Sequence, residues 1–91
     1  GMNPKFNALT PPVIVQVAAM GKPESARRIS ANLGKKTSQS VRIISSEVNQ
    51  RMLHKVQIGP VATRSELQIL MNMLAKEGFA NPIVFEVDTR S

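Results

Sequence analysis

The chain repeats one pattern of residues at an offset of 41 positions, and this repeat constrains its possible folds more than any other feature. The stretch Val15-Gln16-Val17 matches Val56-Gln57-Ile58 without a gap. The same offset aligns apolar residues at helical spacing, and these pairs are Ala26 with Leu67, Ile29 with Leu70, and Leu33 with Leu74. Matches in several successive segments indicate an internal duplication, so the two halves should form similar units.

The first half predicts a strand, a helix and a second strand. β-branched residues favour a strand over residues 13–20, and Pro23 suits the first turn of a helix with apolar residues at spacings of 3 and 4. The polar residues 34–40 are typical of a loop. Residues 41–44 then form a short strand, and we expect the polar residues 45–50 to turn the chain.

The second half repeats this order with stronger helix signals. A strand over residues 53–59 precedes Thr63 and Glu66, which fit the N-cap and the N3 position of a capping box. Gly78 stands where a C-terminal glycine would end the helix, and a last strand follows over residues 83–87.

The resulting order, βαββαβ, predicts an α+β fold. Two βαβ-like halves related by a pseudo-twofold axis would form a ferredoxin-like sandwich, a four-stranded antiparallel sheet with two helices on one face. The 91 residues suit one small domain, which we expect over residues 13–87. Gly1 before Met2 is typical of a tag remnant, so residues 1–12 are expected to be remnant and linker, and residues 88–91 a tail.

Two helices can cover only one face of the sheet, so the other face is open to solvent or to a partner. Because strand side chains alternate between faces, Gln16 and Gln57 are expected on this open face. The same alternation adds the polar or small residues Ala18, Arg42 and Lys55 and the apolar residues Ile14, Ile44, Leu53, Ile83 and Phe85. Exposed apolar groups in such number usually mark an interaction surface. Glutamines that merely solvate the face remain an alternative.

The charge of the chain favours an anionic partner. Twelve Lys and Arg residues against six Asp and Glu give a net charge of +6. Nucleic acid, anionic lipid and acidic polysaccharide all fit this charge, as does a generic solvated surface. No apolar run is long enough to span a membrane, and we expect no membrane contact by this domain.

Catalysis is not expected of this chain. It has no Cys and a single His, and its acidic residues are scattered along the sequence. His54 falls on the helix-facing register of its strand, which favours a packing role. No metal-ligand cluster and no glycine-rich phosphate loop is present, so we predict no metal and no cofactor.

RNA-recognition motifs share the βαββαβ order but stack bases on aromatic side chains of the sheet. The corresponding strand here reads LHKVQIG and has no aromatic residue, which argues against nucleic acid as the partner. A nucleic-acid-binding or protein-docking ferredoxin-like module remains the alternative function, since the fold alone does not decide between them.

Two stretches resemble the halves of the SPOR (sporulation-related repeat) domain. They are VIVQVAAMGKPESARRISANL and HKVQIGPVATRSELQILMNMLAKEGF, and the second contains the specific pattern V-x-I-G-P from Val56 to Pro60. The similarity covers residues 13–87. Residues 43–60 are most similar to a SPOR domain that forms the C-terminus of a Gram-negative envelope lipoprotein.

The resemblance implies a monomeric module that binds peptidoglycan, with a preference for glycan strands lacking stem peptides. It also implies a host protein in the periplasm or cell envelope, for instance an outer-membrane lipoprotein, which the domain directs to the division septum. The family's binding positions correspond to Gln16, Ala19, Leu53, Lys55 and Ile83.

The sequence departs from the family pattern in two places. Ala18-Ala19-Met20 stands where Gly-Ser-Phe is frequent, so a serine hydroxyl is missing at Ala19, and Leu53 stands where an aromatic residue is frequent. The expected glycan-binding residues, from alternation and resemblance together, are Gln16, Ala18, Ala19, Arg42, Ile44, Leu53, Lys55, Gln57, Ile83 and Phe85.

Overall fold

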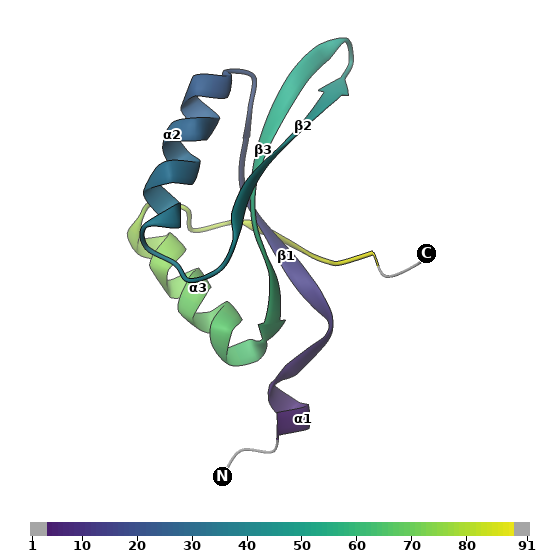
Figure 1. Cartoon of the computed structure of the whole chain (residues 1–91), viewed down its shortest axis with the longest axis vertical. Helices are drawn as coiled ribbons and strands as arrows, with labels where there is room; N and C mark the ends of the chain where they lie inside the picture. Colours follow the sequence, from purple (N-terminus) through teal and green to yellow (C-terminus); the bar gives the residue numbers. More distant parts are fainter. Residues whose placement is uncertain (1–3, 89–91) are drawn as a thin grey trace.

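The computed structural model describes residues 4–88 and has the predicted βαββαβ order, preceded by a short helix within the segment that was expected to be a linker (Figure 1). The elements are α1 (Pro4–Asn7), β1 (Ala8–Met20), α2 (Pro23–Gly34), β2 (Val41–Val48), β3 (Arg51–Thr63), α3 (Arg64–Lys76) and β4 (Ile83–Glu86). The expected tag remnant at Gly1 and Met2 and residues 89–91 of the expected tail lie outside the described residues.

The strands form one antiparallel sheet in the order β2-β3-β1-β4. Both long helices, α2 and α3, lie on the same side of this sheet (Figure 1). The ferredoxin-like α+β fold predicted from the repeat is therefore confirmed. The two central strands, β1 and β3, begin the two repeats, and each edge strand ends a repeat.

Helix-facing side chains of the sheet and one side of each helix form the core. Val15, Ile58, Leu33 and Leu74 are fully buried, and Leu70 nearly so. A fully buried aliphatic side chain stabilises a fold by about 1.5–3 kcal/mol relative to an exposed one. The apolar positions that the repeat aligned in the two helices thus supply most of the helical part of the core.

Three of the four strands are longer than the sequence indicated, and β4 ends at Glu86, one residue earlier than expected. β1 begins at Ala8 instead of residue 13, and β2 and β3 extend beyond residues 41–44 and 53–59. The turn expected over residues 45–50 is wrong, because only Asn49 and Gln50 turn the chain. Their φ angles are 52° and 67°, as a two-residue hairpin of the right-handed twist requires. The end of the hairpin extends away from the helices (Figure 1), so its polar side chains need no core.

Both predicted signals of α3 are confirmed. Thr63 Oγ1 accepts a hydrogen bond from the backbone N–H of Glu66 at 3.1 Å, as an N-cap does. At the other end, Gly78 has a φ of 93°, and the Phe79 N–H donates to the Leu74 carbonyl at 2.8 Å. This is the Schellman arrangement, which closes the helix and turns Phe79 back against the core.

Gly59 of the V-x-I-G-P pattern is required by its surroundings. Its φ is 129°, and a Cβ atom there would lie 2.8 Å from the backbone oxygen of Val13. The close approach of β1 to β3 at this point therefore depends on a missing side chain.

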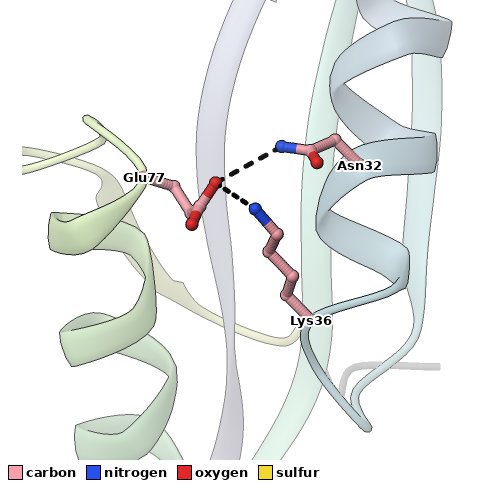
Figure 2. A network of polar contacts seen from close by, with 3 residues as sticks. All are labelled: Asn32, Lys36 and Glu77. Carbon is pink, nitrogen blue, oxygen red and sulfur yellow. Dashed lines mark hydrogen bonds and ion pairs between the residues drawn. The ribbon is translucent and has the colours of Figure 1, made fainter.

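The pseudo-twofold axis passes through two contacts between equivalent residues of the repeats. Gln16 pairs with Gln57 in the centre of the sheet. On the helix side, Lys36 at the end of α2 forms an ion pair with Glu77 at the end of α3, at 2.6 Å (Figure 2). Both pairs are separated by 41 residues, the offset of the repeat. Equivalent residues can contact each other only near the axis, so the axis runs from the open face to the helix layer.

Candidate binding site on the open face of the sheet

The centre of the open face is a pair of glutamines joined to each other. Gln57 Nε2 donates a hydrogen bond to Gln16 Oε1 at 3.0 Å, and both side chains are half-buried. The bond uses one donor and one acceptor and leaves the Gln16 amide N–H₂ and the Gln57 carbonyl oxygen available, since an amide offers both kinds of group. The pair can therefore receive both a hydroxyl and an acetamido group.

One row of residues crosses the whole sheet through this pair. Arg42 of β2 is opposite Gln57, and Ile83 of β4 is opposite Gln16. The next row contains Ile44, Lys55 and Ala19. Eight of the expected residues share this face by register, namely Gln16, Ala19, Arg42, Ile44, Lys55, Gln57, Ile83 and Leu53, and Phe85 joins them opposite Ile14.

Ala18 does not belong to this face, and its assignment from alternation is wrong. It pairs with Val56, which is fully buried in the core. The register of β1 against β3 shifts between Gln16 and Ala18, so β1 contains an extra residue there. Such a bulge ends the strict alternation of side chains. Beyond it Ala19, opposite Lys55, is the residue that returns to the open face.

The apolar part of the face is exposed. Ile83 is 60% exposed, and Phe85 and Ile44 are each 40% exposed. These side chains flank the glutamine pair along β4 and β2. Large apolar groups in such positions can pack against the apolar faces of a ligand that hydrogen-bonds to the glutamines.

The charge of the face is positive and unbalanced. Arg42 and Lys55 lie on it, and neither side chain has an ion pair or hydrogen bond within residues 4–88. The acidic residues of the described strands have the opposite register, since Glu47 pairs with Met52 and Glu86 with Val13. The open face can therefore attract an anion without competition from a carboxylate of its own.

The remaining chemistry-bearing residues lie elsewhere. His54 has the helix-facing register, as predicted, and its Nδ1 is 2.7 Å from the Ser45 hydroxyl. Within the described part of the chain, no three His, Asp or Glu side chains gather closely enough to hold a metal ion. Over the same residues, no helix is both long enough and apolar enough to cross a membrane.

Comparison with known families identifies the fold more narrowly. The model of the SPOR domain matches residues 10–86. The chain belongs to the SPOR domain family. The structure is similar to the crystal structure of the RlpA SPOR domain from Pseudomonas aeruginosa, with a TM-score of 0.76 and 27% sequence identity. That similarity covers 82% of this chain and 99% of the other.

Two curated relatives of this SPOR domain are both named endolytic peptidoglycan transglycosylase RlpA, from the P. aeruginosa strains UCBPP-PA14 and PAO1. Each is 29% identical over 86 residues, which are 92% of this chain and 25% of the relative. The chain thus spans about a quarter of the length of the curated relatives it matches. Membership of the family confirms the resemblance from which peptidoglycan binding was inferred.

Sequence reasoning missed one part of the face. The SPOR domain has a groove beside the β2–β3 hairpin, lined by Gly21, Val48, Asn49, Arg51, Met52 and Leu53. Of these residues only Leu53 was expected in a site. The polar stretch before Arg51 resembled a loop. The only signal of the hairpin turn is Asn49, because the second residue of such a turn is usually glycine and is Gln50 here.

Proposed function

We propose that this SPOR domain binds peptidoglycan with its open face and prefers glycan strands from which the stem peptides have been removed. The observation that carries the proposal is the Gln16–Gln57 pair at the centre of a face that has unpaired cations and exposed aliphatic groups. A stripped glycan strand presents the matching groups, which are hydroxyls, acetamido groups and carboxylates.

The proposed preference for stripped strands rests on the position of the negative charge, because the carboxylates of a stem peptide lie away from the sugar. When a stem peptide is attached, the lactyl group of the sugar is part of an amide and is neutral. Removal of the peptide leaves a free carboxylate in its place. Arg42 and Lys55 can pair with such carboxylates, and charge-assisted hydrogen bonds are about twice as strong as neutral ones. A strand with stem peptides would also bring bulk toward the sheet.

The affinity of a single site should be moderate. The domain has no Trp and no Tyr, so the aromatic stacking that many carbohydrate sites use falls to Phe85 alone. Ile44, Leu53 and Ile83 would instead contact sugar faces and acetyl methyl groups. Such contacts bury less area per side chain than an aromatic ring does.

We further propose that the domain serves as the targeting part of a longer envelope protein and does not itself catalyse. Stripped strands would concentrate the host at the division septum, where stem peptides are removed. The two curated relatives are transglycosylases by name, and the SPOR domain corresponds to only 25% of each. Any such activity of the host would lie in another segment.

Sedimentation with purified cell-wall sacculi tests this function. The 91-residue chain should bind more to sacculi treated with an amidase than to untreated sacculi. Binding should weaken but not disappear as salt is raised, because salt screens the cationic contacts and not the hydroxyl contacts. Gln68→Ala on α3, which changes a glutamine outside the open face, is the matched control for later variants.

Equal binding to treated and untreated sacculi would contradict the preference for stripped strands. Comparable binding to RNA homopolymers, abolished by salt, would favour general attraction of polyanions instead.

A further inference from the structure

The groove beside the β2–β3 hairpin continues the open face toward the end of the molecule that the helices leave uncovered. Its volume is about 460 Å³. Leu53 belongs both to the groove and to the expected site, and Arg51 has the same register as Leu53 and Lys55 on β3. The groove and the face around Gln57 are therefore one continuous surface.

The walls of the groove combine apolar groups with one cation. Val48, which shares the register of Arg51, is 44% exposed. Met52, which also lines the groove, is 50% exposed and has the register of its partner Glu47. Arg51 is exposed and opposite Val48, and its side chain has no ion pair or hydrogen bond within residues 4–88. The neighbouring acidic residue, Glu47, has the other register. This is the same combination of aliphatic groups and unpaired positive charge that surrounds the glutamine pair.

The cations of the face are spaced along the strand direction. A strand rises about 3.3 Å per residue, so Arg51 lies roughly 13 Å from Lys55 along β3 and roughly 20 Å from the row in which Arg42 is opposite Gln57. A small anion could use only one of these positions at a time. A linear polymer with a carboxylate on alternate sugars could use several of them together.

We propose that this groove is a further subsite for the glycan strand, in which Arg51 pairs with a carboxylate beyond the sugars held at the Gln16–Gln57 pair. The inference rests on the proposed function and adds a direction to it, since the strand would run along β3 toward the hairpin. Gly21 at the end of β1 contributes by leaving the groove open, because no side chain projects there.

Two variants address the groove in different ways. Arg51→Ala removes the cation from an exposed hairpin position. Gly21→Leu fills the groove, and the fold should accept it because a Cβ at Gly21 would have no heavy atom closer than the Met52 oxygen at 4.0 Å. Arg28→Ala, on the exposed surface of α2, removes the same charge from the other side of the domain and is the control.

The test is a binding titration of the chain with stripped glycan fragments separated by length. Arg51→Ala and Gly21→Leu should each weaken binding of long fragments about three- to tenfold. They should leave binding of the shortest bound fragments unchanged, since these cannot reach from the glutamine pair to the groove. Gln16→Ala should weaken binding of both.

Unchanged binding of long fragments by both groove variants, with the Gln16→Ala loss intact, would overturn the subsite and leave the proposed function standing. An equal loss at every length would also overturn it, because the groove would then not be a separate subsite. Absence of binding by the parent chain at any length would instead contradict the proposed function.

Discussion

The two glutamines show what an internal repeat can place at one point of a fold. Gln16 and Gln57 occupy equivalent positions of the two halves, and the axis between the halves brings them into hydrogen-bond contact at 3.0 Å. Their orientation toward the open face followed from alternation in the sequence. Their hydrogen bond to each other could not be predicted from the sequence, because the 41-residue offset does not say how β1 and β3 are aligned against each other.

Ala19 tests the corrected register at the level of one side chain. It is exposed and opposite Lys55, whereas Ala18 is opposite the buried Val56. Ala19→Ser should restore the hydroxyl that is frequent in the family and tighten binding to amidase-treated sacculi about three- to fivefold, the value of one modest hydrogen bond. Ala18→Ser is the matched control and should not tighten it. If a sedimentation titration showed tighter binding by Ala18→Ser and not by Ala19→Ser, the assigned position of the bulge would be wrong.

Gly59 carries a prediction on stability. Gly59→Ala should lower the free energy of unfolding by about 2 kcal/mol or more, since the new methyl group would meet the Val13 oxygen at 2.8 Å and the φ of 129° disfavours any side chain. Gly34→Ala is the control, because nothing lies within 4 Å of a Cβ there. Urea denaturation should separate the two variants clearly. Equal stability of both would contradict the close approach of β1 to β3.

At the scale of elements, patterns within one segment predicted more than the contacts between segments. The helix α3 had a cap, an apolar face and a terminal glycine in its own sequence, and its ends were predicted correctly. The bulge in β1 was not predicted, because it is defined by pairing with β3. The residues around it, Val15, Val17 and Ala18, have the composition of a regular strand. Ala18 was for this reason assigned to the wrong face.

The contact between the helix ends gives a pH-dependent prediction. The hydrogen bond from Lys36 lowers the pKa of Glu77 below its ordinary value of 4.5, with a further contribution from Asn32 (Figure 2). A carboxyl group whose pKa is lower in the folded state stabilises the fold above its ordinary pKa. That contribution is lost as the pH falls through the lowered value, where the folded state also takes up the proton.

Glu77→Gln should therefore reduce the melting temperature slightly at neutral pH, and the difference from the parent should shrink in acid. Both side chains are partly exposed, so raised salt should also reduce the difference. The measurement is a series of thermal melts of both proteins, from neutral pH down to below the ordinary pKa of Glu77. A difference that grows toward low pH would contradict the assigned direction of the pKa change.

At the scale of the whole molecule, the division of the sheet into a covered and an open face determined both the fold and the candidate site. Two helices and four strands leave one face uncovered, and this could be reasoned from the element order alone. The groove at the hairpin could not, because the polar residues of a ribbon that extends beyond the core resemble those of a loop. Sequence periodicity reports burial, and the hairpin end is not buried.

The most direct test of the central claim is sedimentation with amidase-treated sacculi by the double variant Gln16→Ala, Lys55→Ala. Both side chains are half-buried on the open face and lie outside the core, so the fold should stay intact, with a loss of about 1 kcal/mol in stability for the broken Gln16–Gln57 bond. Binding should fall about tenfold or more relative to the parent, while Gln68→Ala on the helix side should bind as the parent does. Full retention of binding by the folded double variant would contradict the account, because the ligand would then not use the open face.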